Sequence, residues 1–240
     1  KYACNSFLAL KISFANMIAN LCTAMGANYN DVKRGLGSDT RIGKKFLNAG
    51  IGYGGSCFPK DVRALIQMAE DAGIGVPLLR EVEALNGAQK KRLVDMVSEH
   101  YGSRDLKGKT FAVWGLAFKP DTDDMREAPS LSVIPALLAA GATVRAHDPV
   151  AMDVARPLLP AAVTMGDPFS ILEGADALLI LTEWRDYQEV DLKLVGNRLK
   201  DRIIFDGRNM YPPAQLKAMG LTYYGIGNHP EHMTDLEGIA

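Results

Sequence analysis

Cysteine, net charge and long apolar runs are all scarce in this sequence. Three cysteines (Cys4, Cys22 and Cys57) occur among 240 residues, without the spacing of a metal site. This number and spacing argue against a disulfide framework or a structural metal, and they predict a reduced, cytoplasmic chain. The formal net charge of −1 gives no strong electrostatic attraction to nucleic acid or to an anionic membrane. No apolar run approaches the ~20 residues that a membrane span needs, and no signal peptide is recognisable, so we expect no membrane attachment.

The sequence also lacks an initiating methionine and any segment ahead of its first helical pattern, KYACNSFLALKISFANMIA. We therefore expect this chain to be the remainder of a longer protein. Residues 2–26 place apolar side chains on nearly every face, which is typical of a helix buried in a large core or between subunits. We expect this helix to form a homodimer interface, because an isologous dimer is the commonest way to cover such a surface.

Two halves of different character follow each other along the chain. The first half reads as helices at 2–26, 30–36, 60–72 and 77–101. The second half alternates strands at 109–115, 142–148, 175–183 and 202–207, with a further candidate at 222–227, and helices at 129–140, 168–173, 191–199 and 212–219. Such alternation predicts an α/β fold whose parallel sheet binds ligands at the carboxyl ends of its strands. We expect a helical dimerisation region at 1–101, a Rossmann-like doubly wound domain at 102–240, and a loose tail at 229–240.

The first strand of the second half leads into GLAFKPDTDDMRE and not into a three-glycine dinucleotide fingerprint. That fingerprint would set a pyrophosphate on the start of a helix. The predicted sheet is therefore suited to a nucleotide, but its own residues do not indicate NAD.

The stretch GIGYGGSCFPKD, residues 50–61, places Cys57 where a helix is predicted to begin. Free N–H groups and the helix dipole favour an anion in a first turn, and Lys60 adds a positive charge nearby. These conditions favour a thiolate nucleophile, with Asp61 on the same helix face four residues later. The glycines permit close approach of a ligand. The alternative for Cys57 is a small buried hydrophobe, which is what we expect of Cys4 and Cys22.

Four cations or amides are candidates for ligand contacts. Lys1 and Asn5 repeat the four-residue spacing on the first helix and could present two donors to an oxyanion, with a solvated helix end as the alternative. Lys119 and Arg208 each follow a predicted strand, where either could bind a phosphate or remain a surface charge. His147, at another strand end, shows no partner in the sequence and is expected to be structural.

Four stretches in order, KYACN…KISFAN, RIGKKFLNAGIGYGGSCFPKD, GLAFKPDTDDMRE and FDGRN, closely resemble the UDP-glucose 6-dehydrogenase family. This family belongs to the nucleotide-sugar dehydrogenases, which include enzymes acting on GDP-mannose and UDP-N-acetylmannosamine. Tyr53 and Phe58 look like the UDP-glucose branch. The resemblance covers nearly the whole chain and implies an NAD-dependent, two-fold oxidation of UDP-glucose at C6 to UDP-glucuronate for polysaccharide biosynthesis. The oxidation would pass through a thiohemiacetal and a thioester on Cys57.

The same resemblance implies roles for individual residues. Lys1 and Asn5 would stabilise the oxyanion and orient the water, and Asp61 would assist proton transfer. Lys60 and Arg126 would touch NAD. The residues implied to contact the nucleotide sugar are Lys1, Asn5, Arg41 (reaching the site of a second subunit), Phe46, Leu47, Asn48, Ala49, Gly50, Gly54, Phe118, Lys119 and Arg208.

Compared with the family pattern, the dinucleotide-binding domain with its GxGxxG fingerprint is missing. We therefore expect most NAD contacts to lie outside this chain, and the chain alone to be inactive. Two alternatives stay open. One is a non-catalytic nucleotide-sugar-binding and dimerisation module, which would have no use for Cys57 together with Asp61. The other is a sibling enzyme acting on GDP-mannose, which a comparison of ligand stabilisation against unfolding would distinguish.

Overall fold

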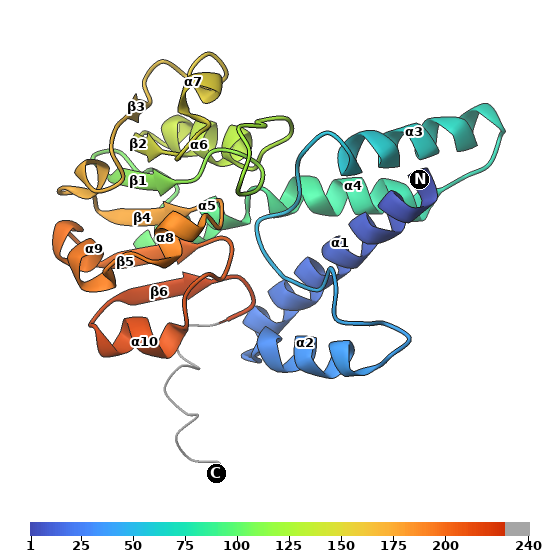
Figure 1. Cartoon of the computed structure of the whole chain (residues 1–240), viewed down its shortest axis with the longest axis horizontal. Helices are drawn as coiled ribbons and strands as arrows, with labels where there is room; N and C mark the ends of the chain where they lie inside the picture. The colour runs from blue at the N-terminus through green and yellow to red at the C-terminus, as the bar shows by residue number, and fades with distance from the viewer. Residues whose placement is uncertain (229–240) are drawn as a thin grey trace, which may run out of the picture.

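The computed structural model describes residues 1–228 of the chain. Figure 1 shows a group of helices from the N-terminal part beside a parallel sheet from the C-terminal part. The loose tail predicted at 229–240 lies outside the described residues. The helices of the first part are α1 (Tyr2–Met25), α2 (Tyr29–Ser38), α3 (Phe58–Asp71), α4 (Pro77–Gln89) and α5 (Arg92–Tyr101).

Local capping signals set the ends of the first three helices. Gly26 follows the last turn of α1 in the left-handed conformation (φ 74°), which glycine adopts readily because it has no Cβ. The Asn28 side chain accepts from the backbone N–H of Asn30 at 2.8 Å and caps α2. α3 begins directly after Cys57, with Pro59 in its first turn. The first three predicted helices are therefore confirmed.

The single helix predicted at 77–101 is wrong, because the chain leaves helical geometry at Lys90 and Lys91 and forms α4 and α5 instead. The N–H of Lys91 bonds to the carbonyl of Ala88 at 3.0 Å, which is a tighter turn than an α-helix makes. The buried Lys90 places its Nζ 3.1 Å from a carboxylate oxygen of Glu127. As a result, α4 stays against α1 while α5 packs on the sheet. Residues 90 and 91 are lysines, with no glycine or proline at the turn to signal it, so the sequence pattern did not reveal the break.

The second part forms a six-stranded sheet in the order β3-β2-β1-β4-β5-β6, and every neighbouring pair is parallel. The order reverses between β1 and β4, which makes the sheet doubly wound and creates a crevice at the carboxyl ends of those strands. The predicted α/β fold is confirmed. The strands are β1 (Thr110–Trp114), β2 (Thr143–His147), β3 (Thr164–Met165), β4 (Ala177–Ile180), β5 (Ile203–Asp206) and β6 (Thr222–Gly225).

The sequence predicted five of these strands and missed β3, because two residues are too few to show alternation. It also missed the single-turn helices α7 and α8, and the helix predicted at 168–173 is a short 3₁₀ helix. The remaining elements of the second part are α6 (Ser130–Ala139), α7 (Met152–Ala155), η1 (Ser170–Leu172), α8 (Arg185–Gln188), α9 (Leu192–Arg198) and α10 (Pro213–Ala218).

Successive residues of each strand face two different cores. Phe111 and Val113 of β1 pack with residues of α5 and α6, whereas Ala112 and Trp114 pack with residues of η1, α8 and α9. Helices therefore cover both faces of the sheet, as Figure 1 also shows. The domain boundary at residue 102 stays a prediction, although Leu93 of α5 already shares the core with the sheet.

α1 buries small or polar side chains and exposes large apolar ones. Its buried residues include Ser6, Ala9, Ser13 and Asn16. Its exposed residues form one stripe of Phe7, Phe14, Met17, Leu21 and Met25, which we call the α1 apolar stripe. A helix normally buries its large apolar face, so the single chain leaves this stripe without the cover that the sequence analysis expected.

α1 is also long and apolar enough, by length and composition, to cross a membrane, with 24 residues and a mean hydropathy of 1.4. By this criterion of length and composition, the prediction that no apolar run is long enough to span a membrane is wrong. The helix packs against α3 and α4, and the core helix of a soluble protein meets the same criterion as a span.

Candidate functional site

Three residues predicted to act in catalysis meet where α1 and α3 pack. Asn5 donates through Nδ2 to Oδ2 of Asp61 at 2.6 Å, and Lys1 Nζ lies 3.5 Å from the same oxygen. Asp61 is fully buried, whereas Lys1 is exposed. Lys1 and Asn5 share a helix face because they are four residues apart, and so both reach the one carboxylate. We call Lys1, Asn5 and Asp61 the carboxylate cluster.

The electrostatic environment favours the charged form of Asp61. Burial alone would raise the pKa of Asp61, but the hydrogen bond from Asn5 and the charge of Lys1 outweigh it, so the pKa lies below its ordinary value. The second oxygen, Oδ1, is buried and has no hydrogen-bond partner within residues 1–228. Because an unpaired buried acceptor is costly, this oxygen is suited to accept a hydrogen bond from a water or a ligand hydroxyl.

Cys57 lies at the N-terminal end of α3, and its side chain is exposed. The backbone N–H of Asp61 donates to the Cys57 carbonyl at 2.9 Å, which places the thiol beside the first turn of the helix. Ser56 Oγ lies 3.8 Å from Sγ. The thiol is thus accessible, and it adjoins the carboxylate cluster through one helical turn.

The other two cysteines differ from each other. Cys22 lies in the core, as predicted, and burial raises the pKa of its thiol. Cys4 is exposed, so the prediction that it is a core residue is wrong. The reason is its place in the first turn of α1, because the buried face of that helix begins only at Ser6.

Buried carboxamides hold the glycine run before Cys57. Asn16 of α1 accepts from the N–H of Gly50 at 2.8 Å, and Gln89 of α4 donates to the Gly50 carbonyl at 2.7 Å. Asn86 of α4 accepts from the Tyr53 N–H at 2.9 Å and donates to the Tyr53 carbonyl at 3.1 Å. The backbone of the run is therefore fixed by side chains from two helices, without being part of a strand or a helix itself.

The glycines are required by neighbouring protein atoms. A Cβ on Gly54 would lie 2.3 Å from the Glu127 carbonyl oxygen, and one on Gly55, where φ is +82°, would lie 2.7 Å from the Phe118 ring. Neighbouring protein atoms alone therefore require glycine at both positions. That these glycines let a ligand approach stays a prediction, and Gly54 does line the cleft described below. They make room for the loop that follows β1, and they join the helical region to the sheet.

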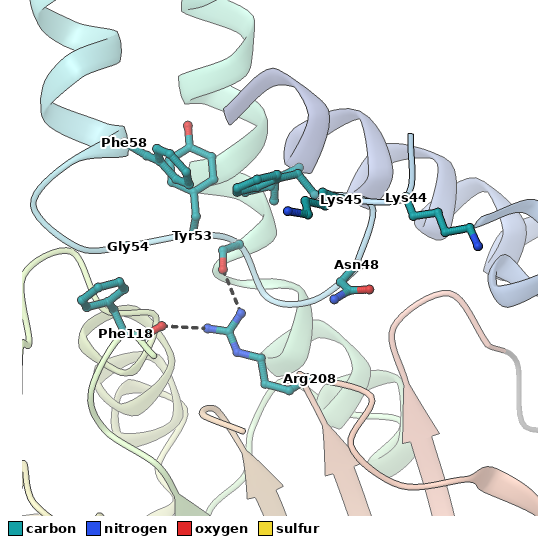
Figure 2. A pocket seen from close by; sticks show the side chains of 11 residues that line it. Lys44, Lys45, Asn48, Tyr53, Gly54, Phe58, Phe118 and Arg208 are labelled. Carbon is teal, nitrogen blue, oxygen red and sulfur yellow. Dashed lines mark hydrogen bonds between the residues drawn. The ribbon is translucent and has the colours of Figure 1, made fainter. Parts of the chain in front are cut away.

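A cleft of about 540 Å³ opens at this junction. Figure 2 shows Tyr53 and Phe58 beside the start of α3, with Phe118 and Arg208 facing them from the side of the sheet. The rings of Phe46 and Tyr53 lie edge-on to Phe58, with centroids 6.1 and 5.7 Å away. The cleft combines an aromatic wall with three cations, the exposed Lys44 and Lys45 and the deep Arg208, which suits a ligand that has both a ring and an anionic group.

Arg208 connects three segments of the chain. Its Nε donates to the Leu181 carbonyl at 2.8 Å, one terminal nitrogen to the Gly52 carbonyl at 3.1 Å, and the other to the Phe118 carbonyl at 3.5 Å (Figure 2 draws the last two). Glu183 Oε2 lies 3.3 Å from Nε. A guanidinium has five N–H groups, so two remain for a ligand after these three bonds to residues of the described part.

Two of the five residues of the stretch 46–50 line the cleft. Phe46, with φ 62°, and Asn48 line the cleft. Leu47 and Ala49 are buried, and Gly50 has both its N–H and its carbonyl bonded to carboxamides. The structure thus leaves Phe46 and Asn48 as the members of this stretch whose side chains line the cleft.

Four predicted cations lie elsewhere. Arg41 is exposed and its guanidinium binds Asp39, and Arg126 is exposed and binds Asp124. Lys119 Nζ lies 5.6 Å from the centroid of the Phe118 ring and does not line the cleft, and Lys60 is exposed at the start of α3. None of the four lines the cleft, although the Gly55 N–H donates to the Arg126 carbonyl at 2.7 Å and so keeps Arg126 near the thiol.

A second, more polar cavity of about 280 Å³ adjoins the cleft at the carboxyl ends of β4 and β5. The sequence analysis named Asn48, Ala49, Gly50 and Arg208 among the residues that line it and missed the others. The available signal was their position directly after predicted strands, as in LTEW and FDGRN. The polar side chains that line this cavity are Asn16, Asn48, Glu183, Gln188, Arg208 and Asn209.

His147 is paired, as a structural histidine should be: its Nδ1 lies 2.9 Å from the hydroxyl of Tyr187. Burial lowers the pKa of His147. Within residues 1–228, no group of three or more His, Cys, Asp or Glu side chains is placed to hold a metal ion.

Two domain profiles match most of the chain. Residues 1–88 match the central domain of the UDP-glucose/GDP-mannose dehydrogenase family, and residues 112–213 match the UDP binding domain of the same family. The unmatched segment between them contains all of α5 and the start of β1.

Individual relatives agree with these matches. A UDP-glucose 6-dehydrogenase of Pseudomonas aeruginosa is 50% identical over 233 residues, covering 95% of this chain and 51% of the relative. A UDP-glucose 6-dehydrogenase of Bacillus subtilis is 47% identical over 228 residues, covering 95% and 49%. A solved UDP-glucose dehydrogenase of the archaeon Pyrobaculum islandicum superposes with a TM-score of 0.83 at 39% identity, covering 95% and 50%. The chain thus spans about half the length of the relatives that it matches.

Proposed function

The chain belongs to the UDP-glucose/GDP-mannose dehydrogenase family, and from this premise we propose that it supplies the catalytic thiol and the nucleotide-sugar site of a cytoplasmic UDP-glucose 6-dehydrogenase. The reaction is a two-fold oxidation of UDP-glucose at C6 to UDP-glucuronate. The observation that carries the proposal is the carboxylate cluster beside an exposed Cys57 at the start of α3. The relatives named above support UDP-glucose over GDP-mannose as the substrate.

Cys57 acts as the nucleophile in this proposal. After the first oxidation, the thiolate adds to the C6 aldehyde and forms a thiohemiacetal, whose oxygen takes up a proton. The second oxidation removes a hydride and that proton and leaves a thioester. Water then attacks the thioester carbon, and the thiolate departs as the carboxylate forms. A thiolate suits both roles, because it adds to a carbonyl and is also a good leaving group.

The carboxylate cluster supports these steps. Lys1 and Asn5 each present N–H donors beside Asp61, and such donors stabilise a developing oxyanion on the substrate. The unpaired Oδ1 of Asp61 is suited to hold the attacking water and to accept its proton. Oδ2 of Asp61 thus keeps the two donors in place, and Oδ1 activates the water.

NAD, when bound, accepts the hydride in each oxidation. The residues of this chain fit one edge of a dinucleotide, because Lys60 and Arg126 add exposed positive charge near Cys57. They do not fit the pyrophosphate cradle. The turn after β1 has one glycine, Gly115, and a Cβ there would lie 2.4 Å from Thr182. We therefore expect the 240-residue chain not to reduce NAD by itself, which NADH absorbance in the presence of UDP-glucose would test.

The α1 apolar stripe supports a homodimer. Five large side chains of one helix face are exposed, and contiguous apolar surface of this kind is typical of a protein interface. A second copy offers the same stripe, so a two-fold axis across α1 would cover both. The guanidinium of Arg41, which lies outside the cleft of its own chain, is proposed to reach the cleft of that second copy.

The experiment that tests the site is alkylation of the three thiols, mapped by mass spectrometry with and without UDP-glucose. We expect UDP-glucose to slow the reaction of Cys57 and to leave the reaction of Cys4 unchanged. Both thiols are exposed, but only Cys57 directly precedes a residue that lines the cleft, Phe58. GDP-mannose at the same concentration should protect neither. Equal protection of Cys4 and Cys57, or no protection, would contradict the proposed site, and protection by GDP-mannose alone would favour the sibling enzyme.

A further inference from the structure

Asp148 is a fully buried carboxylate at the carboxyl end of β2. Its Oδ2 accepts from the backbone N–H groups of Leu116 and Ala117 at 2.7 and 3.1 Å and from the indole N–H of Trp184 at 3.2 Å. Its Oδ1 accepts from two N–H groups of the turn after β2 at 3.0 and 2.8 Å. One side chain therefore joins the loops that follow β1, β2 and β4.

The segment fixed by Asp148 leads directly into Phe118 and Lys119. Its carbonyl groups are bonded too: Ser130 donates to the Leu116 carbonyl at 2.5 Å, and Thr182 donates to the Ala117 carbonyl at 2.6 Å. The two peptides before Phe118 thus have little freedom to shift. This loop supplies the Phe118 wall of the cleft and the ring that packs on Gly55.

Asp206 fixes the backbone of the loop after β5, as Asp148 fixes the loop after β1. It is fully buried, and its Oδ1 accepts from the N–H of Arg208 at 2.9 Å. Its Oδ2 accepts from the N–H groups of Met210 and Tyr211 at 2.7 and 3.3 Å and from the Tyr223 hydroxyl at 3.0 Å. The loop that carries the deep cation of the cleft is therefore bonded around a single carboxylate.

A third buried carboxylate lies at the opposite edge of the sheet and bonds to nothing near the cleft. Asp176, just before β4, accepts from the Thr110 N–H at 2.8 Å and from Lys109 and Lys200 at 3.1 Å each. Its exposed fraction is 2%. Asp176 resembles Asp148 and Asp206 in burial, although two of its three donors are lysines, and it belongs to the amino-terminal edge of the sheet. It therefore provides a control for the loss of a buried carboxylate away from the cleft.

A buried carboxylate is costly unless donors surround it. It offers about four acceptor sites and no donor, so it can collect the N–H groups of several peptides at once. A carboxamide of the same shape would turn an NH₂ group toward at least one of these N–H groups and force the loop to shift. Replacing Asp by Asn at these positions therefore changes the loop geometry with almost no change in side-chain volume.

We propose that Asp148 and Asp206 are positioning residues for nucleotide-sugar binding, which hold the loops of Phe118 and Arg208 in the geometry that forms the cleft. This inference rests on the proposed function for the identity of the ligand. The side chains of Asp148 and Asp206 do not line the cleft. They act by fixing the backbone of the two loops, and these loops carry Phe118 and Arg208, which do line the cleft.

The test compares Asp148→Asn, Asp206→Asn and the control Asp176→Asn in the 240-residue chain. Calorimetric titration with UDP-glucose and with UDP is made at a temperature where thermal unfolding shows each variant to be folded. We expect the first two variants to bind about ten-fold more weakly or worse, as for a misplaced charge-assisted hydrogen bond. The control should stay within about two-fold of the unsubstituted chain, even with a similar drop in Tm.

Amide hydrogen exchange gives a second readout that needs no ligand. Faster exchange at 116–118 in Asp148→Asn and at 208–211 in Asp206→Asn, without faster exchange inside β1 and β4, supports the proposal. If the unsubstituted chain binds no UDP-glucose, the proposed function fails, and the exchange result still decides the positioning role. If Asp148→Asn does not fold, Thr182→Val is used in its place, and Tyr223→Phe is used in place of Asp206→Asn. Each of these substitutions removes one hydroxyl from the same network of hydrogen bonds. Unchanged affinity with unchanged exchange, or an equal loss in Asp176→Asn, would overturn the proposal.

Discussion

The helical region and the sheet domain distribute apolar side chains in opposite ways. The sheet buries large residues such as Trp114, Phe111 and Phe205 between covering helices. α1 instead buries Ser6 and Asn16 and exposes its apolar stripe. The sheet domain is therefore complete in one chain, whereas the helical region uses its buried face for polar contacts to the site and leaves its apolar face for another surface.

The largest expected effect is the loss of stability when a large side chain is removed from the core of the sheet domain. Phe205→Ala removes a ring that is fully buried in the core, and we expect it to lower the free energy of unfolding by about 3–5 kcal/mol. Phe7→Ala removes an equal ring from α1 that is 61% exposed, and at protein concentrations where the chain is monomeric it should cost under about 0.5 kcal/mol. Urea denaturation of both variants measures the difference. Equal losses would show that the two regions do not differ as described.

The next effect concerns the surface that the helical region leaves open. Phe14→Asp places a charge in the α1 apolar stripe and should convert a dimer to a monomer or an aggregate, because the partner copy would bury that charge unpaired. The control is Met68→Asp, an exposed position on α3 outside the stripe. Light scattering at micromolar concentration reports the mass. A monomeric unsubstituted chain, or a dimer that tolerates Phe14→Asp, would contradict the proposed interface.

A smaller effect is expected where the two regions meet. Arg208→Ala removes the cation that bonds to the Gly52 and Phe118 carbonyls. A charge-assisted hydrogen bond contributes about 1.5–3 kcal/mol, so UDP-glucose should bind about ten-fold more weakly or worse. Titration calorimetry measures the change, with Arg34→Ala as a control for an exposed arginine outside this cleft. Unchanged affinity would remove Arg208 from the site.

The thiols give a comparison within the helical region. Cys57 should alkylate faster than Cys4 near neutral pH. Both are exposed, but Cys57 is the N-cap residue of α3 and interacts with the positive charge of Arg126, whereas Cys4 is already inside the first turn of α1. Cys22 should react slowest, since it is buried. Mass-mapped labelling over time orders the three. Cys4 reacting before Cys57 would argue against an activated nucleophile.

The smallest expected effect is the pH dependence of the carboxylate cluster. The pKa of Asp61 lies below its ordinary value of 3.8 because Asn5 and Lys1 outweigh its burial. Its contribution to stability is therefore full above that ordinary value and is lost as the pH falls through the lowered pKa. The free energy of unfolding of the unsubstituted chain should exceed that of Asp61→Asn at pH 7, and this difference should shrink on acidification to pH 3. A difference that grows with acid would mean that the cluster favours the neutral carboxyl group.

Local pattern was sufficient for some features of the site and insufficient for others. The four-residue spacings of Lys1 with Asn5 and of Cys57 with Asp61 indicated shared helix faces, and the structure places Asn5 2.6 Å from Asp61. The role of the glycine run could not be read in the same way, because the atoms that a Cβ would meet belong to Glu127 and Phe118, more than 60 positions away. The exposure of Cys4 and the break at Lys90 likewise depend on which neighbouring helix is present.

The sequence by itself determined the doubly wound sheet, because alternating apolar strands and helices have few other ways to bury both faces. It also determined the helix start at Cys57, since glycine and proline restrict the backbone locally. Only the tertiary structure decided that one buried oxygen of Asp61 has no partner, that Arg208 joins three loops, and that Asp148 and Asp206 bind the backbone around the cleft. These are contacts between segments far apart in the chain, and their geometry exists only once the packing of the sheet has brought the loops together.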